Sequence, residues 1–178
     1  MAKKTSKPAG PKLPAKLAKL LELKKAKFNV LQHRTVFTAF DASQTLRVDP
    51  KQIAKTLIVQ LDRELAIAVI PGDCNLDVGA LKKVVNAERK KAAEPIAAAK
   101  KVTLVTERTI TNKITDKAGA VTPIGALYKL PTYADKALLK QKKLIVNAGS
   151  FTTSLELSGS TYVKLAEPIV GSFSKKRK

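Results

Sequence analysis

The chain has 178 residues, a single cysteine and a formal net charge of +20 at pH 7. This length fits one domain with a full hydrophobic core. Cys74 alone excludes an intrachain disulfide, and no run approaches the roughly 18 apolar residues of a transmembrane helix. The N-terminus has no apolar segment of the secretory type, so a cytoplasmic protein without a membrane partner is expected.

The positive charge is spread along the whole chain. Residues 1–27 carry nine lysines and one glutamate, or +8, and residues 175–178 carry +4, which leaves 20 − 8 − 4 = +8 on the body. A body this basic favours a polyanion such as nucleic acid as partner. Solubility in a crowded cytoplasm is the alternative explanation.

The N-terminal region divides at residue 13. Residues 1–12 have the composition of a disordered basic tail. Leucines recur at helical spacing over residues 13–27 and predict a basic amphipathic helix that opens the domain. Residues 28–35 predict a short strand with His33, the only histidine. One histidine and one distant cysteine are too few ligands for zinc, so no metal site is expected. A hydrogen-bonded structural role is typical of such a histidine, and a general base is the alternative.

The next segment predicts a core hairpin with a lysine at its entrance. Asp49 as N-cap and Pro50 open a short helical turn over residues 50–54 that leads directly into Lys55. Residues 56–61 and 65–70 are almost continuously apolar and predict two buried strands. A lysine directly before such a strand is held at a sheet end, where its ammonium can meet an anionic ligand. A solvated terminal lysine is the alternative.

The rest of the chain alternates between helical and strand patterns. Helices are expected at 76–89 and 135–143, and the ambiguous stretch 94–111 reads as an alanine-rich helix followed by a strand at 102–105. Strands are expected at 144–148, 151–157 and 162–165, and Pro168 closes the fold. The predicted class is α+β, a mixed sheet with surrounding helices, over a domain at 13–173 followed by a basic tail at 174–178.

A constrained loop lies between Gly119 and Gly125. Two glycines and Pro123 within seven residues let the backbone approach a ligand closely. The loop is not a phosphate-binding loop of the Walker type, because no Lys-Ser/Thr pair follows Gly125. Ordinary turns use the same residues, so this signal is weak by itself.

Four blocks in this order, residues 54–59, 65–72, 119–125 and 146–150, resemble the YbaK/ProX family of aminoacyl-tRNA editing domains. The likeness spans about residues 16–172. It implies the editing-domain fold found free-standing or inserted in bacterial prolyl-tRNA synthetases. It also implies a deacylase that hydrolyses the ester joining a wrong amino acid to the 3′ end of tRNA, with no metal and no cofactor.

The resemblance also implies roles for individual residues. Lys55 matches the family lysine beside the terminal adenosine and its phosphate. Gly119 opens the G-x-x-x-P loop that borders the aminoacyl ester, and these two are the catalytic candidates. The implied substrate-binding residues are Thr56, Ala120, Val121, Thr122, Pro123, Gly125, Asn147, Gly149 and Ser150.

The implied function is trans-editing of mischarged tRNA, with tRNA(Pro) carrying Cys, Ala or another small amino acid as substrate and prolyl-tRNA synthetase as a partner. An aminoacyl ester is already activated, so positioned water, oriented donors and the substrate's own groups suffice. Many relatives have His where this chain has Phe151, which leaves the amino acid open. The alternative is a non-catalytic basic RNA-binding or synthetase-associated regulatory protein on the same fold.

Overall fold

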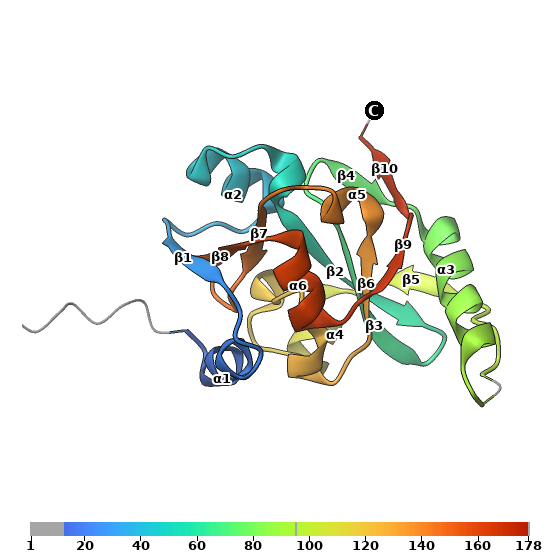
Figure 1. Ribbon diagram of the computed structural model, residues 1–178. Helices are drawn as coiled ribbons and strands as arrows, with labels where there is room; N and C mark the ends of the chain where they lie inside the picture. Colours follow the sequence, from blue (N-terminus) through green and yellow to red (C-terminus); the bar gives the residue numbers. More distant parts are fainter. Residues whose placement is uncertain (1–12, 95, 178) are drawn as a thin grey trace, which may run out of the picture.

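A five-stranded mixed sheet forms the centre of the computed structural model, which describes residues 13–94 and 96–177 (Figure 1). The strand order is β5-β2-β3-β6-β9. β2 is antiparallel to β3 and β5, whereas β6 is parallel to β3 and β9. The strands are β2 (Ala54–Leu61), β3 (Glu64–Pro71), β5 (Val102–Leu104), β6 (Thr132–Asp135) and β9 (Ile169–Gly171).

Two smaller sheets flank this one. An antiparallel sheet of order β1-β8-β7 combines β1 (Phe28–Gln32), β7 (Leu144–Asn147) and β8 (Thr153–Leu157). A two-stranded sheet pairs β4 (Cys74–Leu76) with β10 (Ser174–Lys176). A parallel bridge between Ile53 and Ile145 joins the entrance of β2 to β7. The start of β2 therefore lies where the central sheet meets the first of these smaller sheets.

Most of the α-helices begin at a residue whose side chain caps the first turn. The Thr38 side chain and Asp41 form a capping box at α2, and Asp77 accepts the Ala80 N–H at α3. The α-helices are α1 (Ala15–Leu23), α2 (Ala39–Leu46), α3 (Val78–Lys91), α4 (Glu107–Lys113), α5 (Lys136–Leu139) and α6 (Gly159–Ala166). The 3₁₀-helices are η1 (Pro50–Gln52), η2 (Ala118–Ala120) and η3 (Gly125–Tyr128).

The β2–β3 hairpin separates two apolar cores. Ile58, Ile67 and Val69 pack on one face with residues of α1, α5, α6 and the β1-β8-β7 sheet. Val59, Ala68 and their neighbours pack on the other face against α3. Successive strand residues point to opposite faces, so a strand buried on both sides must be apolar throughout. This explains why the two runs are almost continuously apolar, and the predicted α+β class with a mixed sheet is confirmed.

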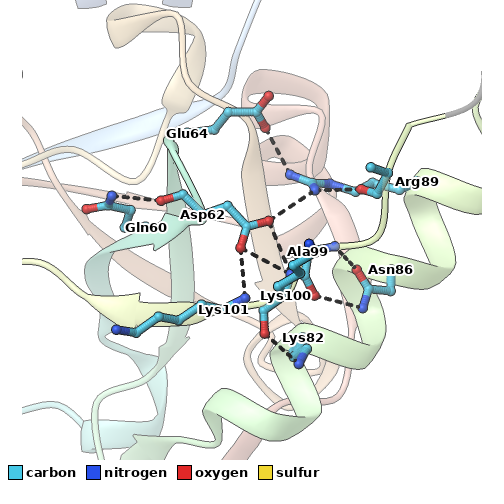
Figure 2. Close-up of polar contacts among 10 residues, drawn as sticks. Gln60, Asp62, Glu64, Lys82, Asn86, Arg89, Ala99, Lys100 and Lys101 are labelled. Carbon is cyan, nitrogen blue, oxygen red and sulfur yellow. Dashed lines mark hydrogen bonds and ion pairs between the residues drawn. The ribbon is translucent and has the colours of Figure 1, made fainter.

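The turn of the hairpin is tied to α3 and to the segment before β5 (Figure 2). Asp62 has a φ of 57°, and its carboxylate accepts the N–H groups of Lys100 and Lys101 at 3.1 and 2.8 Å. Asn86 of α3 accepts the Ala99 N–H at 2.7 Å, and Arg89 contacts Glu64 at 3.0 Å. Side-chain oxygens thus accept the backbone N–H groups of residues 99–101, and residues 96–101 form no helix.

Three expectations from the sequence need correction. The described part of the alanine-rich stretch is not helical, and α4 follows β5 there. Residues 162–165 belong to α6 and not to a strand, because Ser158 caps a helix that buries Tyr162, Leu165 and Ala166 at helical spacing. The basic C-terminal segment contains β10, which pairs with β4 and is part of the fold. The tail predicted at residues 1–12 lies outside the described residues.

Candidate functional site

A cleft of about 560 Å³ opens at the entrance of β2. Its lining comes from five places in the sequence: residues 36–42, residues 53–57, the η2 region, β7 with β8, and Arg177 after β10. Apolar residues such as Ile53 and Ile145 form much of the wall, and Thr38, Asn147 and Ser154 add polar groups. A mostly apolar concavity with a few convergent polar groups is typical of a ligand site.

Lys55 is the second residue of β2 and faces this cleft. Its backbone pairs with Ile70 of β3, and the buried Ile53 and Ala54 precede it, so its Cα is held firmly. The half-buried ammonium donates a 3.2 Å hydrogen bond to the Cys74 carbonyl oxygen. Burial lowers the pKa of Lys55, and the nearby Arg177 charge lowers it further. The expected position at the end of a core strand is confirmed.

The cations of Lys55 and Arg177 line the same cleft. Within residues 13–94 and 96–177, neither forms an ion pair with a carboxylate; the five ion pairs found involve other residues. Two like charges that face one concavity without a counterion repel each other. The cleft is therefore suited to an anionic ligand.

The glycine loop reaches the cleft through its first half. Gly119 in η2 is exposed there, and a Cβ atom built on it would lie 3.0 Å from Cε1 of Phe151. Val121 also lines the cleft. A side chain at position 119 would thus press on the Phe151 ring, which explains why a glycine fits this position.

The second half of the loop is anchored to the core. The Thr122 N–H donates to the Tyr128 hydroxyl at 3.2 Å, the Tyr162 hydroxyl donates to the Pro123 carbonyl oxygen at 2.8 Å, and the Gly125 N–H donates to Thr132 Oγ1 at 2.9 Å. Four loop residues expected to bind substrate are buried and do not line the cleft: Ala120, Thr122, Pro123 and Gly125. Their observed contacts fix the shape of the loop.

Asn147 lies at the cleft and holds the following turn. Its Oδ1 accepts the N–H groups of Gly149 at 2.6 Å and Ser150 at 3.2 Å, and its Nδ2 donates to the Ser150 carbonyl oxygen at 3.0 Å. Gly149 has a φ of +79°, which a residue with a Cβ adopts only at a cost. Gly149 and Thr122 line a separate pocket of about 400 Å³ instead, and Ser150 lines neither cavity. Of the predicted residues, the structure thus brings together Lys55, Thr56, Gly119, Val121 and Asn147.

Sequence reasoning missed the aromatic side of the cleft. Phe37 and Phe40 line it although they are 67% and 60% exposed, and the Phe37 ring centroid lies 5.3 Å from that of Phe151. Exposed phenyl rings beside a cleft can stack on a flat ligand group. Two phenylalanines three residues apart in a short segment before the first core strand were the available signal. Arg177 was missed because it belongs to a run of basic residues read as a tail.

His33 lies behind the cleft and supports one of its polar groups. Its Nδ1 is 2.8 Å from the Arg34 carbonyl oxygen, and its Nε2 is 3.0 Å from Oγ of Ser154, which lines the cleft. A carbonyl oxygen only accepts, so Nδ1 donates to Arg34, and in the neutral imidazole Nε2 accepts from the Ser154 hydroxyl. The expectation of a hydrogen-bonded histidine is confirmed.

Two kinds of feature are absent from residues 13–94 and 96–177. Nowhere in these ranges do three or more His, Cys, Asp or Glu side chains gather closely enough to hold a metal ion. No helix in the same ranges combines the length and apolar character needed to cross a bilayer.

Residues 33–165 match the sequence model of the aminoacyl-tRNA editing domain family. The structure of hypothetical protein APE2540 superposes with a TM-score of 0.74 at 23% identity, covering 90% of this chain and 99% of that one. A proposed trans-editing enzyme for prolyl-tRNA synthetase superposes with a TM-score of 0.69 at 19% identity, covering 92% and 99%. At these identities the structural likeness shows the shared fold alone.

Proposed function

The chain belongs to the aminoacyl-tRNA editing domain family, and from this premise we propose that it is a free-standing aminoacyl-tRNA deacylase. It hydrolyses the ester that joins a wrong amino acid to the 3′ end of tRNA. The observation that carries the proposal is the cleft, where Lys55, the Gly119 loop and Asn147 meet from three distant parts of the sequence. These are segments of the blocks on which the family resemblance rests.

The proposed chemistry needs few groups. Lys55 supplies a positive charge for the terminal adenosine and its phosphate, and the backbone at Gly119 borders the ester carbonyl and the attacking water. An aminoacyl ester is already activated, so placing water and donors correctly provides most of the required rate. The anchors at Tyr128, Tyr162 and Thr132 support this role because they hold the loop in one shape before substrate binds.

The proposed substrate is tRNA(Pro) carrying Cys, Ala or another small amino acid. The apolar wall near Val36, Ala42 and Ile145 suits a small side chain. A binding pocket separates side chains that differ by one methylene by only about 1–3 kcal/mol, which is why a second, hydrolytic site is useful to translation. Prolyl-tRNA synthetase, in the cytoplasm, is the proposed source of the substrate.

The decisive experiment is release of amino acid from a panel of mischarged tRNAs, with alanyl-, cysteinyl- and seryl-tRNA(Pro) among them. Wild type is compared with Lys55→Ala and with Lys51→Ala, an exposed lysine outside the cleft that gives the same charge change. We expect hydrolysis of one member to be lost in Lys55→Ala and kept in Lys51→Ala. Equal rates in all three proteins would contradict the proposal.

The net charge of +20 favours one second candidate, a non-catalytic basic RNA-binding or synthetase-associated regulatory protein. This candidate predicts no hydrolysis across the panel, together with tRNA binding that weakens steeply with salt and does not depend on Lys55. Retention of tRNA by Lys55→Ala without any wild-type hydrolysis would favour it. Formation of a stable complex with the synthetase would identify the regulatory form.

A further inference from the structure

The C-terminal strand delivers a second cation to the cleft. β10 pairs with β4 in a register that places Lys176 opposite Cys74. Arg177 follows directly, and its backbone N–H donates to the Asp73 carbonyl oxygen at 3.4 Å while its Nε donates to Asn75 Oδ1 at 3.3 Å. Lys55 donates to the carbonyl oxygen of the same Cys74. β4 is therefore the common support that brings Arg177 and Lys55 to one place.

The position of β10 is built into the core. The carboxylate of Asp135, a residue only 2% exposed, accepts the N–H groups of Phe173 at 2.6 Å and Ser174 at 2.8 Å. The Phe173 ring is buried against the α3 side of the sheet, and its carbonyl oxygen accepts the Asp77 N–H at 2.8 Å. These contacts fix the backbone as far as Ser174, three residues before Arg177. Its guanidinium is thus presented to the cleft by a paired strand.

The positive charges of Lys55 and Arg177 favour the binding of an anion between them. The Arg177 charge is near enough to Lys55 to lower its pKa, second in effect only to burial. Neither cation has a carboxylate partner in the described part of the chain. A guanidinium presents a planar fork of donors that matches phosphate oxygens, and an ammonium adds a compact point charge. The repulsion between the two is relieved when a phosphate lies between them.

We infer that Arg177 and Lys55 together form a phosphate-binding site, and that the phosphate is the one 5′ of the terminal adenosine of the tRNA substrate. The identity of the nucleotide rests on the proposed function, whereas the two-cation site rests on the geometry of the cleft. Arg177 lies beyond the range 33–165 that matches the family model, so the family match does not assign it. It is a binding residue that this chain supplies through its C-terminal strand.

The test compares adenosine 5′-monophosphate with adenosine, because the two differ only in the phosphate. Affinities are measured by NMR titration of the full chain for wild type, Arg177→Ala, Arg177→Lys and Lys176→Ala, an exposed neighbour outside the cleft lining. We expect wild type to bind adenosine 5′-monophosphate about tenfold more tightly than adenosine. A tenfold difference corresponds to one charge-assisted contact of about 1.4 kcal/mol. The ratio of the two affinities should fall severalfold in Arg177→Ala, where Lys55 alone remains, fall less in Arg177→Lys and stay unchanged in Lys176→Ala.

The possible outcomes test the phosphate site and the proposed deacylase activity separately. An unchanged ratio in Arg177→Ala would overturn the inference, and so would inorganic phosphate that competes as strongly as the monophosphate. If the ratio falls while no mischarged tRNA is hydrolysed, the phosphate site stands and the deacylase proposal fails. If a tRNA is hydrolysed, we expect Arg177→Ala to raise KM severalfold with kcat nearly unchanged, and an unchanged KM would count against the site.

Discussion

The hydroxyl of Tyr162 donates a 2.8 Å hydrogen bond to the carbonyl oxygen of Pro123, and both residues are buried. Burial raises the pKa of Tyr162, which keeps the phenol protonated and able to donate. Through this bond α6 fixes the second half of the glycine loop while the first half stays at the cleft. The shape of the candidate site thus depends on a residue that does not line it.

Replacing Tyr162 by Phe is expected to lower both stability and activity. The buried Pro123 carbonyl would lose its partner, which costs about 1–3 kcal/mol, and the loop would lose an anchor. Urea denaturation and deacylation rates measure the two effects. Tyr133→Phe is the matched control, because no hydrogen bond of the Tyr133 hydroxyl is found among the described residues, and it should change neither. A Tyr162→Phe protein as stable as wild type would contradict the role of the bond.

The close approach of Gly119 to the Phe151 ring predicts that a larger side chain at position 119 impairs activity, and that removing the ring relieves this loss. In Gly119→Ala the new methyl group would lie 3.0 Å from Cε1 of Phe151, closer than side chains normally approach. We expect the loop to shift by a few tenths of an ångström and activity to fall, by about tenfold or more for a misplacement of this kind. In the Phe151→Ala background the same change should cause little further loss, so the double variant Gly119→Ala/Phe151→Ala should be about as active as Phe151→Ala alone. Equal loss in both backgrounds would mean that the ring is not the cause.

Asp135 is predicted to control the C-terminal strand. Its two carboxylate oxygens accept three N–H groups, those of Ala137, Phe173 and Ser174. Asp135→Asn turns one of these oxygens into a donor that faces other donors, so we expect a loss of about 3 kcal/mol in the free energy of unfolding. The preference for adenosine monophosphate over adenosine should also weaken, because Arg177 follows the strand. Hydrogen exchange of β10 amides would report its release, and protection equal to wild type would rule out the predicted effect.

The lowered pKa of Lys55 predicts a pH dependence of stability with a definite sign. Burial and the Arg177 charge lower it from 10.5, so the unfolded chain holds this proton more tightly than the folded chain. The resulting penalty is present at pH values below the lowered pKa and disappears as the pH rises to 10.5. Wild type should therefore gain stability relative to Lys55→Met as the pH rises through this window.

Urea denaturation of both proteins at neutral pH and at pH 10.5 gives the difference directly. The Arg177→Ala background should show a smaller change, because the second cause of the shift is removed. A difference that stays constant would show that Lys55 titrates alike in the folded and unfolded chains, and a difference that moves in the opposite direction would show that folding raises the pKa of Lys55.

Local sequence patterns determined the hairpin and its lysine. Residues 56–61 and 65–70 are mainly apolar on both faces, which favours a buried pair of strands and places Lys55 as a charge at their entrance. The glycines and proline of 119–125 likewise require a constrained loop. The order of these blocks was also enough to identify the family. Each of these features depends on residues close together in the chain.

Residues 162–165 show where local pattern was insufficient. Tyr162 and Leu165 fit a short strand as well as a helix, and the helix forms because Ser158 caps it and its buried side faces the core. The split within the glycine loop was equally hidden. Which loop residues face the cleft depends on Tyr128, Thr132 and Tyr162, and on where the fold places these three side chains.

The sequence by itself thus determined the fold class, the family and the lysine at the strand entrance. The reason is that strand burial and turn geometry depend on residues close together in the chain. Only the tertiary structure decided that a basic C-terminal run is a paired strand. Residues 174–177 contain no apolar residues whose spacing could indicate a strand. The strand forms because Asp135 and Phe173, buried in the core, hold the start of this segment beside β4. Arg177 therefore reaches Lys55 through contacts between distant segments, which no local pattern records.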